Sequence, residues 1–152
     1  MSKGWRPKQF VRPITIGILK RQNELLLAPV KNDDGQTKGW RPLGGEIEFG
    51  ETSETALLRE FLEELDEKIV VERQLGTVEN IYKHEGQVGH EIVFVHQVRF
   101  ISSVAYEKKQ FVFSDGGLPY NATWVDVQFF ESSNEQLYPE GLLKILKPSF
   151  SP

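Results

Sequence analysis

Three glutamates crowd one short stretch of the chain, and their grouping suggests metal chemistry. Residues 44–64 read GGEIEFGETSETALLREFLEE, with Glu60, Glu63 and Glu64 almost side by side. Arg59 is the only cation inside this cluster, so the carboxylates repel one another. Closely grouped carboxylate oxygens are the ligands that Mg²⁺ and Mn²⁺ prefer, and a divalent ion would convert the repulsion into attraction. The stretch therefore predicts a divalent-metal site.

The same stretch has the pattern of an amphipathic helix from Ser53 to about Leu65. Thr52 can cap its first turn, and Glu54 suits the positive end of the helix dipole. Apolar residues at helical spacing predict a stripe that faces the core: Leu58, Phe61, Leu62 and Leu65. Acids repeat this spacing on roughly the opposite side: Glu60, Glu63, Glu64 and Glu67. A merely solvated helix face is the simpler alternative, but such a face usually interleaves lysines with its acids.

Glycine-rich sequence leads into this helix. Gly44, Gly45 and Gly50 permit backbone shapes and close approaches that other residues resist. Further acids accompany these glycines: Glu46, Glu48 and Glu51. Together with the helix, they predict a rigid loop that folds back and supports the acidic face.

The spacing of these residues resembles the Nudix box, G-x5-E-x7-R-E-U-x-E-E-x-G-U, in which U is a bulky apolar residue. Gly45, Glu51 and the run at 59–64 fill its positions. Asp66 stands where the box has glycine, and Glu67 stands where it has an apolar residue. Both departures lie at the end of the helix and leave the proposed metal carboxylates intact.

The surroundings extend this resemblance over most of the chain, from about Ile14 to Phe130. WRPLGG at 40–45 resembles the RPLGG segment of one Nudix branch, and ENIYKHEGQVGHEIVF at 79–94 resembles the region after the box in that branch. The resemblance implies an α/β fold of the α+β type, an α/β/α sandwich with a mixed sheet. It also implies a hydrolase that uses Mg²⁺ or Mn²⁺.

By position, the resemblance assigns roles to the acidic residues. Glu60, Glu63 and Glu64 would be the metal ligands, and Arg59 would orient a carboxylate such as Glu51. The implied reaction cleaves the pyrophosphate linkage of a nucleoside diphosphate joined to another group. The substrate would be a nucleoside triphosphate, a dinucleoside polyphosphate or a nucleotide sugar.

Pyrophosphate hydrolysis also needs a base. Divalent ions would neutralise the phosphate charge and lower the pKa of a bound water, and a nearby carboxylate would accept the proton of that water. We take Glu60 as this base. The alternatives are Glu91, Glu107 and Asp115.

Several residues are candidates for substrate binding. An arginine before the glycines can meet a phosphate, although a surface ion pair explains it equally well. Aromatic side chains such as Phe49 can stack on a base, although an aromatic more often belongs to the core. The predicted substrate-binding residues are Arg41, Trp40, Gly44, Gly45 and Tyr82.

Further elements are expected on both sides of the helix. The patterns predict a hairpin, a polar loop, three more strands and a short C-terminal helix stopped by Pro148. The hairpin joins 14–19 to 24–30 and the loop covers 32–39; the later strands cover 75–82, 90–101 and 123–130, and the helix covers 140–146.

Size and composition restrict the class of protein. The chain has 152 residues, 39% apolar and 26% charged, which suits a single domain over 1–152. Its net charge of −4 argues against binding a nucleic acid polymer. Without cysteine, a membrane-length apolar run or a signal peptide, it is expected in the cytoplasm. The resemblance adds that such proteins often form homodimers.

Two other functions compete with hydrolysis. A non-catalytic, nucleotide-binding regulatory Nudix domain would keep the fold, but it would be free to lose any of the three glutamates. An isomerase acting on an isoprenoid diphosphate would need a catalytic cysteine, and the chain has none.

Overall fold

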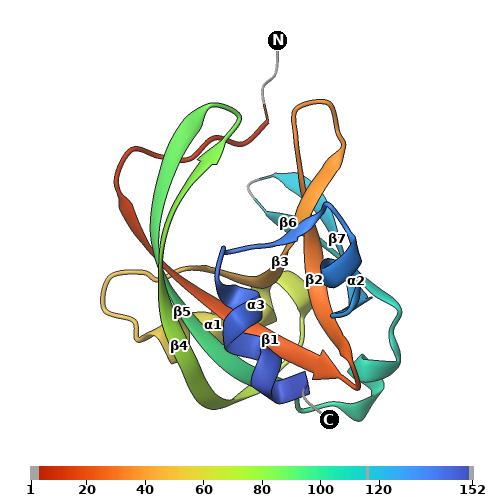
Figure 1. Cartoon of the computed structure of the whole chain (residues 1–152). Helices are drawn as coiled ribbons and strands as arrows, with labels where there is room; N and C mark the ends of the chain where they lie inside the picture. The colour runs from red at the N-terminus through yellow and green to blue at the C-terminus, as the bar shows by residue number, and fades with distance from the viewer. Residues whose placement is uncertain (1–3, 116, 151–152) are drawn as a thin grey trace.

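A single mixed sheet runs through the molecule (Figure 1). The computed structural model describes residues 4–115 and 117–150. The strand order is β4-β5-β1-β3-β2-β7-β6, with β8 beside β3; β1 is parallel to β5 and β3 to β8, whereas the other pairs are antiparallel. The strands are β1 (Val11–Arg21), β2 (Glu24–Lys31), β3 (Thr37–Glu46), β4 (Ile69–His84), β5 (Gln87–Phe100), β6 (Gln110–Asp115), β7 (Leu118–Asp126) and β8 (Gln136–Leu137).

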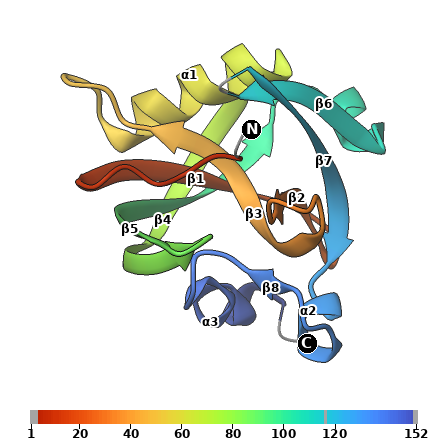
Figure 2. The ribbon, with the colours of Figure 1, turned by 90° about the horizontal axis from the view of Figure 1, so that it is seen from above.

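Helices lie on both sides of this sheet. Figure 2 shows α1 on one side and α2 and α3 on the other, which confirms the expected mixed α+β architecture. The helices are α1 (Ser53–Leu65), α2 (Phe129–Ser132) and α3 (Leu142–Leu146), with 3-10 turns at Ser103–Glu107 and Lys147–Phe150. No helix of the described residues has the length and apolar character needed to cross a membrane.

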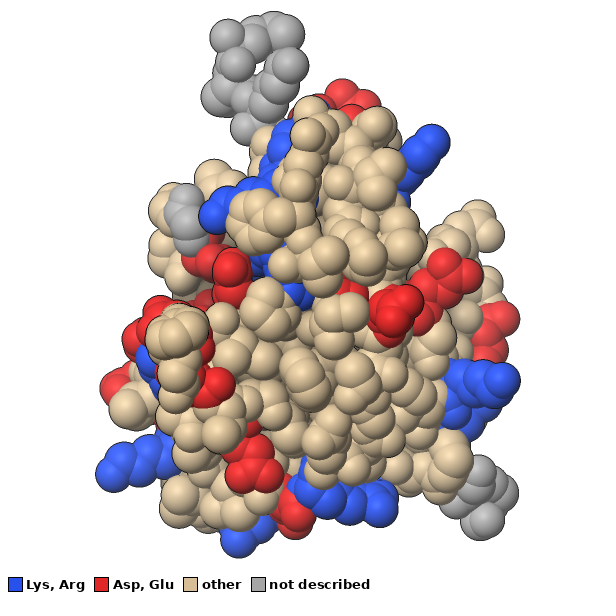
Figure 3. Space-filling model, turned by 90° about the vertical axis from the view of Figure 1, so that its left-hand side faces the viewer, with Lys and Arg blue, Asp and Glu red and all other residues tan. Residues whose placement is uncertain are grey.

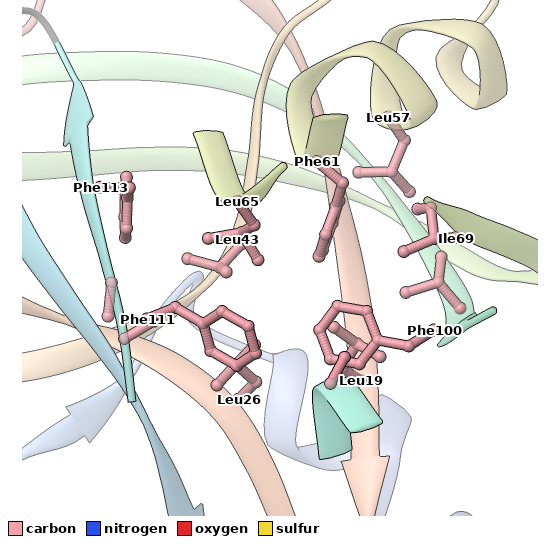
Figure 4. Packing of buried hydrophobic residues seen from close by; sticks show 14 residues of the cluster. Leu19, Leu26, Leu43, Leu57, Phe61, Leu65, Ile69, Phe100, Phe111 and Phe113 are labelled. Carbon is pink, nitrogen blue, oxygen red and sulfur yellow. The ribbon is translucent and has the colours of Figure 1, made fainter. Parts of the chain in front are cut away.

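Alternation along β1 supplies side chains to two cores. Leu19 packs in the cluster beneath α1, whereas Ile18 and Ile16 pack in the cluster beneath α3. In Figure 4, Phe61 of α1 meets Phe100 of β5, whose ring centroid is 6.5 Å away. The catalytic candidates on α1 therefore rest on a filled apolar layer.

The helix α1 has the predicted bounds, but only Phe61 and Leu65 of its predicted core-facing stripe are buried. Ala56, Leu57, Phe61 and Leu65 are buried, whereas Leu58 and Leu62 are 43% and 47% exposed. The leucines at 57, 58, 62 and 65, together with Phe61, form two overlapping stripes, and periodicity alone does not choose between them. The correction matters because Glu60 and Glu64 now flank the buried face instead of opposing it.

The predicted hairpin forms but soon opens. β1 and β2 pair only at Lys20 with Leu25 and Arg21 with Glu24. Beyond this point β3 bridges the two strands, pairing its residues 43–46 with β1 and its residues 37–42 with β2. The expected loop at 32–39 is correspondingly shorter, because β3 begins at Thr37.

Other elements match the patterns with shifted ends. The strands at 75–82 and 90–101 are confirmed as β4 and β5, and both are longer than predicted. The strand at 123–130 is β7, which ends at Asp126. The C-terminal helix ends at Leu146, before Pro148, and a 3-10 turn follows.

Candidate metal-dependent active site

Hydrogen bonds fix the beginning of α1 against the sheet. Thr52 is the N-cap, and its hydroxyl accepts a hydrogen bond of 3.1 Å from the amide of Thr55. The hydroxyl of Thr15 donates to the carbonyl of Ser53 at 3.0 Å, and Ser53 Oγ lies 2.9 Å from Nε2 of the buried His96. The position of the helix carboxylates is thereby tied to β1 and β5.

Arg59 joins the glycine loop to the helix. Its Nε and Nη2 donate to the two oxygens of Glu51 at 2.8 and 2.9 Å, a bidentate pair. Nη2 also donates to the carbonyl of Glu46 at 3.1 Å, and Nη1 donates to Glu60 at 3.0 Å. The hydrogen bonds from Arg59 and from the amide of Glu48 lower the pKa of Glu51 to about 2. The loop therefore supports the acidic helix, as expected.

Glu60 fits against a residue that has no side chain. It is 14% exposed, and a Cβ added to Gly45 would lie 2.5 Å from its Oε1. Gly44 has a different role, because a Cβ there would overlap the carbonyl oxygen of Thr15 on β1. The two glycines thus allow the helix and the neighbouring strand to approach β3.

Glu60 and Glu64 share a partly desolvated environment. Burial raises the pKa of Glu60. Burial also raises the pKa of Glu64, and the negative charges of Glu60 and Asp115 raise it further, whereas Arg41 opposes this effect. Two carboxylates pressed together in this way favour a shared cation, or a proton in its absence.

A second group of side chains lies beside this pair. Arg41 on β3 lies 3.7 Å from Asp115 at the end of β6, and its guanidinium carbon is 5.5 Å from the ring centroid of Tyr120. Tyr120 in turn stacks on Phe113, with centroids 5.5 Å apart. Asp115 is the one alternative base that the structure brings to Glu64.

Glu63 does not complete a preformed triad. Its side chain is 60% exposed and lies 3.4 Å from Arg59. Among the described residues, no three Asp, Glu or His side chains are gathered closely enough to hold a metal ion. Glu60 and Glu64 come together, whereas Glu63 would have to leave Arg59 to join them.

Other predicted residues make contacts of their own. Tyr82 donates to Glu91 at 3.3 Å, and Glu91 also lies 3.4 Å from Arg12. Trp40 packs against the core cluster beneath α3, and its indole donates to Glu135 at 3.0 Å. Arg12 also lies 3.3 Å from Glu46, so it joins Tyr82 and Glu91 to the loop that follows Gly45. Glu107 is exposed on a 3-10 turn, and Phe49 is fully exposed in the loop after β3.

Sequence patterns missed Tyr120 and Phe113, which carry the stack under Arg41. They lie on β6 and β7, well after the helix in the sequence, and no spacing signal links them to it. The FVF run at 111–113 was the available hint, since aromatic and β-branched residues favour strands.

Comparison with known families decides the classification. A profile described as the NUDIX domain matches residues 11–141. The chain belongs to the Nudix family. No curated protein sequence matches it.

Solved structures share this Nudix fold at low identity. A NUDIX hydrolase from Nitrosomonas europaea aligns with a TM-score of 0.64 and 15% identity over 95% of this chain and 88% of that chain. An ADP-ribose pyrophosphatase from Streptococcus suis 89-1591 aligns with a TM-score of 0.58 and 15% identity, covering 92% of each chain. A MutT NUDIX hydrolase from Burkholderia pseudomallei aligns with a TM-score of 0.56 and 22% identity over 79% of this chain and 86% of that chain.

The departures from the Nudix box at the end of α1 have a structural explanation. Asp66 caps the helix in the left-handed region, at φ 54° and ψ 38°, and its amide donates to the carbonyl of Leu62. Glycine adopts this conformation most readily, and aspartate tolerates it better than most residues. Glu67 is paired with Lys108 at 3.2 Å and therefore needs no apolar contact.

Proposed function

We propose that this chain is a metal-dependent pyrophosphohydrolase that cleaves the diphosphate linkage of a nucleoside diphosphate joined to another group. The observation that carries the proposal is the desolvated pair Glu60 and Glu64, held beside Arg41 on the helix of the Nudix box. A solvated helix face would leave both carboxylates in water. Here burial and mutual repulsion prepare them for a cation.

The carboxylates suit Mg²⁺ or Mn²⁺ because both ions prefer oxygen ligands. Glu60 and Glu64 would hold the ion, and Glu63 would join them after releasing Arg59. When bound, the ion would neutralise phosphate charge and acidify a water molecule. Arg59 would stay with Glu51, because their bidentate pair leaves it unavailable to the substrate.

Positive charge for the substrate would come from Arg41. It is 30% exposed, and its distance of 3.7 Å from Asp115 makes a loose ion pair that a phosphate can replace. Glu60 remains our choice of general base, and Asp115 is the alternative. Gly45 would leave room for the Glu60 carboxylate beside the diphosphate.

The candidate substrates are inferred from the family and from the groups in the site. A nucleoside triphosphate, a dinucleoside polyphosphate and a nucleotide sugar all contain the diphosphate that these groups would hold. The structural neighbour called an ADP-ribose pyrophosphatase adds ADP-ribose to the candidates. We propose one cytoplasmic domain that acts on small nucleotides, in the branch marked by the RPLGG segment.

A substrate panel tests this proposal. Purified protein is incubated with nucleoside triphosphates, dinucleoside polyphosphates, nucleotide sugars and ADP-ribose, with Mg²⁺, Mn²⁺ or EDTA, and the products are separated by ion-exchange chromatography. We expect one class to yield a nucleoside monophosphate only when metal is present. Tight binding of a nucleotide without cleavage under every condition would instead identify a non-catalytic binding domain.

A further inference from the structure

The first strand in the sheet order, β4, has an open edge. Among the described strands it pairs only with β5. In the first half of β4, the register with β5 shifts between Val71 and Arg73 and again between Gln74 and Gly76. Such bulges protect a strand edge from pairing with another chain. The second half of β4, from Gly76 to His84, is called the upper half below. Its register with β5 is unbroken, so it has no such protection.

On one face of this upper half, the side chains are exposed to solvent. Thr77, Glu79, Ile81 and Lys83 are exposed, and they alternate with half-buried residues. Ile81 is 63% exposed at the centre of the stripe. Figure 3 looks onto this side of the molecule and shows a broad area with few charged side chains. Glu79 and Lys83 make no side-chain hydrogen bond or ion pair within the described part of the chain.

The arrangement of these residues is self-complementary. Glu79 and Lys83 lie two positions on either side of Ile81, and all three side chains point to the same face of the strand. In an antiparallel pair of identical strands centred on Ile81, each Ile81 would face its own copy. Each Glu79 would then face Lys83 of the other copy, and symmetry would create this ion pair twice.

We propose that the upper half of β4 is a homodimer interface, in which two copies join their sheets edge to edge about a two-fold axis at Ile81. Backbone groups left open by the edge strand would form the new ladder. The charges select the register, because a shift of two residues places Ile81 opposite Glu79 or Lys83 and leaves the other charge without its partner. This inference does not depend on the catalytic proposal.

Charge reversal gives a specific test. In Glu79→Lys, two lysines face two lysines across the axis, and in Lys83→Glu, four glutamates meet. By symmetry each substitution replaces two attractive pairs with two repulsive ones, so we expect dimerisation to weaken by roughly tenfold to a hundredfold. An equimolar mixture of the two variants restores both opposite-charge pairs and should form a heterodimer. All positions are exposed, so circular dichroism should show that the variants remain folded.

Sedimentation equilibrium over a dilution series measures each association. Matched controls are Lys31→Glu on β2 and Glu131→Lys on α2, which reverse exposed charges away from β4 and should leave dimerisation unchanged. Recovery of the dimer on mixing the two β4 variants would support the interface and its register. A wild-type chain that stays monomeric would overturn the proposal, and so would a dimer that ignores both reversals or a mixture that does not recover.

Discussion

Gly45→Ala should remove most activity without unfolding the protein. The added Cβ would lie 2.5 Å from Oε1 of Glu60, whereas ordinary contact begins at 3.4 Å. Glu60 must therefore retreat by about 1 Å. The backbone at Gly45 needs no left-handed conformation, and the displaced atoms are the end of a flexible side chain, so the fold should accommodate the change.

We expect this displacement of Glu60 to lower the catalytic rate and to leave stability nearly unchanged. A misplacement of about 1 Å in a reacting group costs roughly a hundredfold in rate. We therefore expect kcat to fall by about this factor, and the thermal unfolding midpoint to change little. Activity is measured on the preferred substrate with saturating Mg²⁺, and unfolding is followed by circular dichroism.

Gly76→Ala is the matched control. Its Cβ would lie 3.6 Å from Ile145 Cδ1, an ordinary contact, so both the rate and the midpoint should stay near wild type. Full activity in Gly45→Ala would refute the reasoning, since Glu60 would then tolerate displacement. An equal loss of activity in Gly76→Ala would show that the effect is general to these strands.

Three further predictions concern charge and capping. Arg41→Ala should raise KM roughly tenfold with a smaller change in kcat, whereas Arg99→Ala, which removes an equally loose ion pair, should not; steady-state kinetics that show equal effects would argue against phosphate binding. Because the pKa of Glu64 is raised in the folded state, its contribution to stability is present below the ordinary carboxyl pKa and is lost as pH rises through the raised value. The free energy of unfolding in EDTA should thus fall toward neutral pH, and denaturant titration of Glu64→Gln should show a flatter profile; an unchanged slope would contradict the assignment. Asp66→Gly should raise the free energy of unfolding by about 0.5 to 1 kcal/mol, because glycine adopts the left-handed cap without strain, and denaturant titration that shows destabilisation would refute this.

The helix α1 and its acidic residues could be predicted from local spacing, because both depend on neighbours in the sequence. The amphipathic spacing predicted a helix from Ser53 to about Leu65, and Thr52 was recognised as its cap. Leu58 and Leu62 were wrongly assigned to the buried face because leucines at both 57 and 58 allow either stripe. Packing makes the choice: Leu57 is fully buried in the cluster beneath α1, whereas Leu58 stays 43% exposed.

Features that depend on long-range pairing were beyond the sequence patterns. β3 contains Gly39, Pro42, Gly44 and Gly45, which usually interrupt strands, and it forms because β1 and β2 diverge and leave it two partners. The approach of Asp115 to Arg41 likewise depends on β6 closing the far end of the sheet. Trp40 was placed with the substrate because an aromatic ring can stack on a base, yet alternation along β3 turns it to the face opposite Arg41.

The most direct test of the proposed metal-dependent active site compares two glutamates of the same region. Hydrolysis of the preferred substrate is measured for the wild type, Glu64→Gln and Glu67→Gln, each with Mg²⁺ and with EDTA. Glu67 is paired with Lys108 and lies outside the acidic pair. We predict that EDTA or Glu64→Gln abolishes hydrolysis and that Glu67→Gln retains it. Hydrolysis that persists in EDTA, or that survives in Glu64→Gln, would contradict the account.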